Sequence, residues 1–529
     1  MTVSTRIVVF TGGLAYSVRQ GIIEIDRAID GVQWLIVVET PRRTVGRLLR
    51  SQWRNLRRNG WRWIPYQVTD LWQRVAARFE SLPSSTIGAE YAASALERRP
   101  NLRVLRVADI NSESTCAAVL EFAPDLGLSL AASILRERLF GIPRLGTLNL
   151  HKGRLPDYRG MPPAFWELWN DEQAVGCSVH RVDAKLDTGA IVLHESIARE
   201  KYSTVRGMQL RLDTLGVKLM RAAVEQVLSG EAQSLPQPAG GRTNRKPTLA
   251  QIATLERRLA QQGARRSLSL RRMIVNMAGA SARFLWRLGL GRLLAPRIVV
   301  LLYHRVGDDA RDNLTVGIEQ FDRQMALIRK YCRPVSIEEV LDDSVIPTRG
   351  RPLVCVTFDD GYHDNYANAA PILLRHQIPG AFFVSTGLIG TEGRFSHDVR
   401  RGNPLIPLMR WQDLREMCES GFVIGSHSVT HIDCASEPEE VVVSELERSR
   451  ADLQRELGLQ QVIFAYPYGG RQHMTSQRLE LVKKAGYSGC LSGYGGTNIR
   501  PVARFNVLRR AVSWEYSDNA LALEFLGLR

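Results

Sequence analysis

From Arg6 to Gly13 the sequence reads RIVVFTGG, an apolar run that ends in two glycines. Apolar residues then recur at helical spacing over 18–29, and a second apolar run, WLIVV, occupies 34–38. A strand, a tight turn, a helix and another strand in this order predict a parallel α/β unit. Because the glycine pair lacks the full G-x-G-x-x-G spacing, it does not by itself indicate a dinucleotide site.

The same alternation returns in the second half of the chain. Short apolar runs separated by helical segments are IVVLLY, LVCVTF, GAFFVST, VIGSH and VIFAYPYG, which begin at Ile298, Leu353, Gly380, Val423 and Val462. This pattern predicts a parallel barrel or a doubly wound sheet. The stretch after Gly230, SLPQPAGGRTNRKP, is typical of a linker, and 251–295 look helical. We therefore divide the chain into domains at 1–235 and 298–529, joined by a basic linker at 236–297.

Composition and charge narrow the class of protein. Among 529 residues, 44% are hydrophobic and 23% charged, which excludes a disordered, collagenous or coiled-coil chain. No apolar run is long enough for a membrane span, and the N-terminus has no signal-peptide core, so we expect a cytoplasmic protein. Seven scattered cysteines without a C-x-x-C pair indicate a reduced protein.

The net charge of +16 comes from two basic segments, because 42–62 carries +8, 242–297 carries +12 and the remainder is mildly acidic. Such segments bind anionic lipid head groups, nucleotide phosphates or nucleic acid, although a solvated basic face explains them equally well. Arginines at helical spacing within the apolar stretch 273–295 fit a helix at the inner membrane surface or a connecting helix packed on a domain.

Asn149 and His151 mark a candidate site in the first half. They lie two residues apart at the end of an expected strand, so their side chains share one face. The carboxyl end of a strand is where open α/β sheets bind ligands. A strand-end pair satisfied by the turn at 155–156 is the structural alternative.

The longer pattern N-x-H-x-x-x-L-P-x-Y-R-G, followed by WELWN at Trp166 and G-x-S-x-H-x₆-D-x-G-x-I from Gly176, resembles the 10-formyltetrahydrofolate-dependent formyltransferases. This resemblance, over roughly 5–240, implies a Rossmann-like fold, 10-formyltetrahydrofolate as cosubstrate, and Asn149, His151 and Asp187 as catalytic residues.

Those residue types suit formyl transfer to an amine. The Asn149 amide and a protonated His151 can donate to the oxyanion, Asp187 can hold His151 or a water, and a neutral His151 can accept the amine proton. His180 is expected to shape the loop around Asp187. Arg159 fits either a substrate phosphate or a structural contact.

The expected acceptor is an amino sugar linked to a nucleotide or a lipid. Lys152, Gly153 and Arg154 stand where many relatives carry a small residue, Ser and Leu, so acceptor contacts are expected to differ. The second half of the chain stands where the methionyl-tRNA branch carries a nucleic-acid module, which disfavours nucleic acid as a partner.

Asp359 and Asp360 mark a second candidate site, in the motif TFDDGY. To share one site, the two carboxylates must stand on the turn that ends a strand. Downstream, His427 and His431 lie four residues apart, which we interpret as one face of a helical turn. One carboxylate, two imidazoles and an open position suit Zn²⁺ or a similar divalent ion.

YHRV, TFDDGY, HSVTH, FAYPYG and VLRRAV together, over about 298–515, resemble the polysaccharide deacetylases with NodB homology. The resemblance implies a distorted (β/α) barrel, with Asp360, His427 and His431 as metal ligands. It also implies Asp359 as the general base and backbone N–H groups near Tyr468 around the oxyanion.

Two positions depart from that family. Ala465 and Tyr466 stand where many relatives carry an arginine that orients the base. Arg509 and Arg510 stand where those relatives carry a histidine that protonates the leaving amine. Because an arginine does not donate a proton, either His304, a metal-bound water or protonated Asp359 serves as the acid, or the activity is reduced. Arg509 is left to bind a substrate phosphate or carboxylate.

Together these features predict a bifunctional enzyme that hydrolyses an N-acyl group on a carbohydrate and formylates a sugar amine. The order of the two reactions stays open, including removal of formyl groups placed elsewhere. The alternative is an anionic-surface binding protein with catalytically decayed domains.

Overall fold

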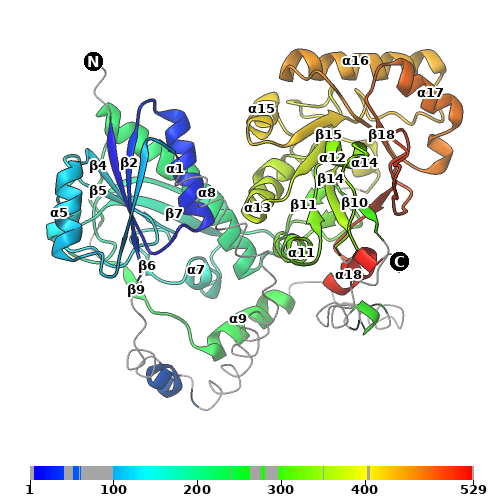
Figure 1. Cartoon of the computed structure of the whole chain (residues 1–529). Helices are drawn as coiled ribbons and strands as arrows, with labels where there is room; N and C mark the ends of the chain where they lie inside the picture. The colour runs from blue at the N-terminus through cyan, green and yellow to red at the C-terminus, as the bar shows by residue number, and fades with distance from the viewer. Residues whose placement is uncertain are drawn as a thin grey trace. The chain divides into compact units, whose positions relative to one another are not determined.

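The computed structural model describes residues 5–40, 52–58, 60, 99–238, 240–261, 275, 277–279, 281, 296–349, 351–401 and 405–526. The chain divides into two compact units, Met1–Ala264 and Arg265–Arg529 (Figure 1). Both units are α/β and each has its own hydrophobic core.

The first unit is built on one seven-stranded sheet of order β3-β2-β1-β4-β5-β7-β8. The strands are β1 (Arg6–Thr11), β2 (Gln33–Glu39), β3 (Leu102–Val107), β4 (Leu126–Ser129), β5 (Thr147–His151), β7 (Ala174–Arg181) and β8 (Ile191–Ala198). β1 to β5 are parallel, whereas β7 and β8 are antiparallel to their neighbours. This Rossmann-like arrangement confirms the predicted fold class.

Helices cover both faces of that sheet. They are α1 (Tyr16–Ala28), α5 (Glu113–Phe122), α6 (Glu137–Phe140), α7 (Phe165–Trp169), α8 (Val205–Ser229) and α9 (Leu249–Gln261). Helices α1 and α8 pack on one face, where Ile22 and Leu212 are fully buried, and α5 and α6 pack on the other, against Phe10 (Figure 1). The apolar spacing of α1 therefore predicts its buried side.

The first unit continues past residue 235, the domain boundary that the sequence predicts. A short strand, β9 (Arg242–Asn244), pairs in parallel with β6 (Tyr158–Gly160), and α9 buries Leu255 and Leu259 in the first core. Arg258 donates a hydrogen bond of 2.9 Å to the carbonyl of Trp169. The Pro/Gly-rich segment that indicated a linker is thus part of the first unit, where it pairs with β6 and adds to the core.

Most of the two basic segments, 42–62 and 242–297, lies outside the described residues, and so does most of the expected membrane-surface helix at 273–295. Where the structure is described, none of the helices is both long enough and apolar enough to span a bilayer.

The second unit is built on a parallel sheet of order β18-β17-β16-β15-β14-β10-β19, with β13 paired to β14. The strands are β10 (Ile298–Tyr303), β13 (Arg333–Pro334), β14 (Leu353–Phe358), β15 (Gly380–Val384), β16 (Val423–Ser426), β17 (Phe464–Ala465), β18 (Cys490–Leu491) and β19 (Arg509–Ala511). Leu491 in β18 also bridges to Val507, two residues before β19. The sheet therefore nearly closes, which confirms a distorted barrel.

Helices surround this barrel (Figure 1). They are α11 (Ile318–Tyr331), α12 (Ile337–Leu341), α13 (Ala370–His376), α14 (Ser396–Arg401), α15 (Trp411–Glu419), α16 (Glu439–Leu457), α17 (Ser476–Lys484) and α18 (Asp518–Leu526). Two short strands, β11 (Arg305–Val306) and β12 (Thr315–Val316), a π-helix at Asn365–Ala369 and a 3₁₀ turn at Arg471–His473 complete the unit. Strands β10 and β14 are buried along their whole length, as expected for parallel strands covered on both faces.

Candidate active sites

Three side chains in the second unit form a compact cluster of potential cation ligands. One ligand atom from each of Asp360, His427 and His431 lies within 4.8 Å of the others. The Asp360 Oδ1 atom is 3.5 Å from His427 Nε2 and 3.3 Å from His431 Nε2. Asp360 follows β14 and the histidines follow β16, so the barrel brings the predicted ligands together at the carboxyl ends of two strands.

The bonding of this cluster fits a divalent cation. Asp360 is 1% exposed, yet neither of its carboxylate oxygens accepts a hydrogen bond from a described residue. A buried carboxylate without compensation costs several kcal/mol, and a cation would remove that cost. His427 Nδ1 donates to the carbonyl of Ala465 at 2.7 Å, which fixes the orientation of the ring and leaves Nε2 facing Asp360, where it can serve as a ligand.

The two histidines stand on a loop and not on a helical turn, so that part of the prediction was wrong. Ser428 and His431 have φ of +65° and +61°, which a right-handed helix excludes. The Ser428 hydroxyl accepts the His431 N–H at 2.9 Å. Glu445 of α16 accepts the N–H groups of Val429 and Thr430 at 2.8 and 2.9 Å. The loop is therefore held by side chains.

Asp359 is anchored by Arg509 beside the cluster. The guanidinium donates two hydrogen bonds of 2.7 Å to the two carboxylate oxygens, and its Nε donates to the Ser492 carbonyl at 2.6 Å. Both side chains are buried. Burial raises the pKa of Asp359, but Arg509 and His427 outweigh burial and hold that pKa below its ordinary value.

The expectation that Arg509 binds a substrate phosphate or carboxylate is therefore wrong. All of its donor groups face protein oxygens, and its side chain has no exposed surface. Arg509, in β19, thus contacts Asp359 in the way expected of the arginine that Ala465 and Tyr466 replace.

Two further imidazoles lie near Asp360. Burial lowers the pKa of His304, although Asp360 and Asp359 raise it. His397, in α14, has its Nε2 3.6 Å from Asp360 Oδ2 and 2.9 Å from the Tyr362 hydroxyl. Sequence reasoning missed His397, because no motif ties it to the aspartate pair.

The direction of these bonds fixes the proton on His397. Tyr362 donates its only hydroxyl proton to the Asp398 side chain, at 2.7 Å. The Tyr362 oxygen must then accept from His397 Nε2–H. His397 therefore presents an N–H, and not a lone pair, on the side facing Asp360.

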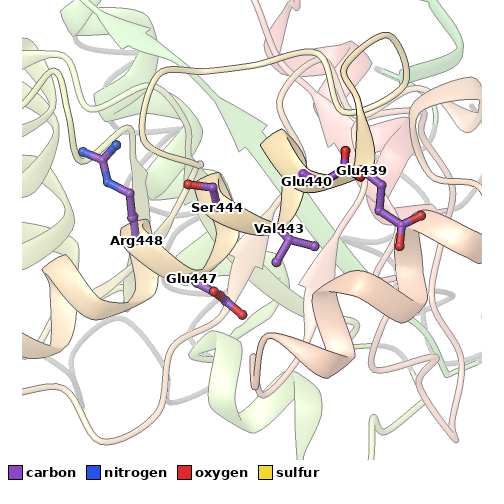
Figure 2. A pocket seen from close by; sticks show the side chains of 6 residues that line it. All are labelled: Glu439, Glu440, Val443, Ser444, Glu447 and Arg448. Carbon is purple, nitrogen blue, oxygen red and sulfur yellow. The ribbon is translucent and has the colours of Figure 1, made fainter.

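A shallow hollow runs along the outer face of α16 (Figure 2). It is lined by residues of that single helix, Glu439, Glu440, Val443, Ser444, Glu447 and Arg448. None of these side chains belongs to the cation cluster, and we assign the hollow no role in chemistry.

In the first unit, His180 connects two of the predicted residues. Asn149 in β5 faces His180 in β7 across the sheet, and their side chains are 3.0 Å apart. His180 Nδ1 must carry a proton because it donates to the carbonyl of Arg181 at 2.8 Å. Because the Asn149 amide nitrogen can only donate, His180 Nε2 accepts from it, and the amide keeps a second N–H. The Asp187 carboxylate lies 3.7 Å from that same Nε2.

His151 lies between Tyr158 and Asp187. Its Nε2 donates to the Tyr158 carbonyl at 2.7 Å, and its Nδ1 is 3.5 Å from Asp187 Oδ2. Burial lowers the pKa of His151, although Asp187 raises it. A neutral ring with a lone pair on Nδ1 is therefore favoured. The structure thus brings Asn149, His151 and Asp187 together.

The flanking basic side chains make internal contacts. Lys152 pairs with Asp213 of α8, and Arg154 pairs with Glu172 at 2.6 Å. Of the two readings of Arg159, the structural contact is the one observed, because Arg159 donates to Gln237 at 2.9 Å. Because these basic side chains contact protein groups, the groups that remain for chemistry are the Asn149 amide and the Nδ1 atom of His151.

Each unit matches a known family. Residues 89–224 match the formyl transferase family, and residues 347–490 match the polysaccharide deacetylase family. Curated relatives include methionyl-tRNA formyltransferase of Enterococcus faecalis, 31% identical over 26% of this chain and 44% of the relative. Another, of Flavobacterium johnsoniae, is 34% identical over 22% of this chain and 37% of the relative. The chain spans less than half of the length of these relatives.

Solved structures are similar to each half. The deacetylase PplD of Streptococcus pyogenes, in complex with acetate, is 23% identical over 44% of this chain and 99% of its own, with a TM-score of 0.37. A sugar N-formyltransferase from a Shewanella species is 14% identical over 48% of this chain and 87% of its own, with a TM-score of 0.31.

Proposed function

We propose that this chain, which joins a formyl transferase domain to a polysaccharide deacetylase domain, is a bifunctional enzyme that modifies amino sugars. One unit hydrolyses an N-acyl group, with an N-acetyl sugar as the expected substrate, and the other moves a formyl group from 10-formyltetrahydrofolate to a sugar amine. The observation that carries the proposal is the buried Asp360 carboxylate, unbonded among the described residues and facing two imidazoles beside an anchored second carboxylate.

For deacylation, Asp360, His427 and His431 would hold a divalent cation, with Zn²⁺ the expected ion. That cation would supply Lewis-acid polarisation of the water and of the acyl oxygen. Asp359 takes a proton from the attacking water, and Arg509 keeps its carboxylate in place. As the C–N bond breaks, protonated Asp359 returns the proton to the leaving amine, because a carboxyl with a lowered pKa gives up its proton readily.

For formyl transfer, the sugar amine attacks the formyl carbon and negative charge develops on the formyl oxygen. The free N–H of Asn149 donates to that oxygen. His151 Nδ1 accepts the amine proton, and Asp187 stabilises the resulting imidazolium. The bond to the folate nitrogen then breaks as His151 passes its proton to that nitrogen, which leaves as an amine and returns His151 to the neutral form.

We infer that the sugar is linked to a nucleotide or a lipid and that both reactions occur in the cytoplasm. All seven cysteine thiols are free, which is typical of a reducing compartment. The segments 42–62 and 242–297, with +8 and +12 charges, support contact with an anionic membrane surface or with substrate phosphates.

The test is to supply the protein with Zn²⁺, 10-formyltetrahydrofolate and a panel of N-acetyl-sugar and amino-sugar nucleotides and lipids. We expect released acetate, an N-formyl sugar and one equivalent of bound metal. Neither product across the panel, with no stoichiometric metal, would instead support an anionic-surface binding protein with decayed sites.

A further inference from the structure

Gln237 holds the backbone of the loop that carries Asp187. Its amide NH₂ donates to the carbonyls of Asp187 and Gly189, at 3.0 and 2.8 Å. Its amide oxygen accepts from Arg159 at 2.9 Å. Both donors and the acceptor of this side chain are therefore used, although Gln237 lies thirteen residues beyond the matched region 89–224.

The Asp187 loop needs such support. Asp187 has a φ of +54°, a left-handed conformation that costs about 1–2 kcal/mol for a residue with a side chain. Strained backbone persists only where its surroundings hold it, and two hydrogen bonds from Gln237 to carbonyls on either side of Thr188 do so here.

The same segment also fixes the carboxylate. Gly160 donates its N–H to Asp187 Oδ2 at 3.1 Å, and its strand β6 is paired with β9, which follows Gln237 closely. Arg159, the partner of Gln237, is the neighbour of Gly160. The main chain of Asp187 is thus bonded to Gln237, and its side chain to Gly160, whose strand pairs with β9.

We propose that Gln237 is a positioning residue for formyl transfer, which sets the Asp187 carboxylate 3.5 Å from His151. This inference rests on the proposed formyl transfer. A displacement of about 1 Å in a reacting group can cost about 100-fold in rate, so loss of these contacts should lower turnover more than binding.

The test is Gln237→Glu, which keeps the shape and the Arg159 contact but removes both N–H donors. We expect kcat for formyl transfer to fall about 10- to 100-fold, with KM changed less than about threefold, in a protein that still unfolds in a cooperative transition. Hydrogen exchange in the peptide 183–190 should become faster. Arg159→Met removes the hydrogen bond to the Gln237 amide oxygen without adding a negative charge, and it should give a smaller loss of kcat.

Gln173→Glu is the matched control, because the exposed Gln173 side chain donates to the Asp171 carbonyl and contacts no residue of the proposed site. A Gln237→Glu protein with normal kcat and normal exchange would overturn the inference. If the unaltered protein transfers no formyl group, the proposed function fails, and the exchange rates alone decide whether Gln237 holds the loop.

Discussion

At the scale of single residues, the pair Asp359–Arg509 is the contact on which deacylation depends most. Two parallel hydrogen bonds of 2.7 Å join the Arg509 guanidinium to both oxygens of the Asp359 carboxylate and fix its orientation. Lysine keeps the charge but cannot make both bonds. We expect Arg509→Lys to lower kcat for deacylation about 10- to 100-fold, with metal content and formyl transfer unchanged.

Arg415→Lys is a suitable control for that substitution, because Arg415 pairs with Glu456 at the exposed surface. Steady-state rates and elemental analysis measure the outcome. Unchanged deacylation in Arg509→Lys would mean that Asp359 does not need the bidentate partner.

Glu167 gives a prediction for pH. It is 2% exposed, and burial raises its pKa to about 7, although the N–H groups of Gly176 and Arg154 lower it. Because this pKa lies above the ordinary 4.5, the contribution of Glu167 to stability is complete below about pH 4.5. It is lost as the pH rises through 7, by roughly 3 kcal/mol. We expect Glu167→Gln to flatten the fall in stability of the first unit between pH 5 and 8.

Urea unfolding followed by the fluorescence of Trp166 and Trp169, which flank this helix position, measures that change. Glu225→Gln, on an exposed part of α8, should leave the pH dependence as it is. An equal slope in the Glu167→Gln protein would show that Glu167 is not the group responsible.

At the scale of elements, the close approach of β6 to β9 requires glycine at 160. Gly160 has a φ of +86°, and a Cβ there would lie 2.3 Å from the Asn244 carbonyl oxygen. We expect Gly160→Ala to separate β9 from β6, to destabilise the first unit by about 2–3 kcal/mol and to reduce formyl transfer, while deacylation stays normal. Thermal unfolding and both activities measure this.

Gly230→Ala is the control that separates the cost of a positive φ from the cost of a steric clash. Gly230 ends α8 with a φ of +79°, and a Cβ there meets no atom within 4 Å. It should cost only about 1 kcal/mol and leave both activities in place. Equal effects of the two substitutions would show that the close pairing of β6 with β9 is not needed for stability or for formyl transfer.

Some elements of the two sites could be predicted from the sequence, and others could not. Apolar runs and their spacing predicted the strand that carries Asn149 and His151 and the strand that precedes Asp360, because burial on a sheet leaves a periodic signal. The role of Arg509 could not be predicted, since it depends on the pairing of β19 with β10, which no local pattern records. The loop holding His427 and His431 has the same four-residue spacing as a helical turn, so spacing alone misled.

Gln237 escaped prediction for a different reason. It lies in a Pro/Gly-rich stretch, and contacts from a side chain to a distant main chain have no period. His397 is similar, because only the folded chain brings α14 to Asp360.

At the scale of the whole molecule, the two units have separate cores, so their activities should be separable. We expect a chelator such as EDTA to abolish deacylation and to lower the melting temperature of the second unit, with formyl transfer retained. The second unit should regain about 4 kcal/mol when Zn²⁺ is returned at a thousandfold excess over its dissociation constant.

Two-transition calorimetry and parallel assays measure this effect, with Asp360→Asn as the control that should no longer respond to the chelator. Loss of formyl transfer together with deacylation would show that the two halves depend on one another.

The packing of β9 and α9 within the first unit has a practical consequence for anyone who wishes to separate the halves. A gene shortened at codon 235 encodes every catalytic side chain proposed for formyl transfer, but neither Gln237 nor the strand and helix that follow. Such a fragment should express poorly or yield an inert protein. A cut placed beyond codon 261 preserves what the first half needs.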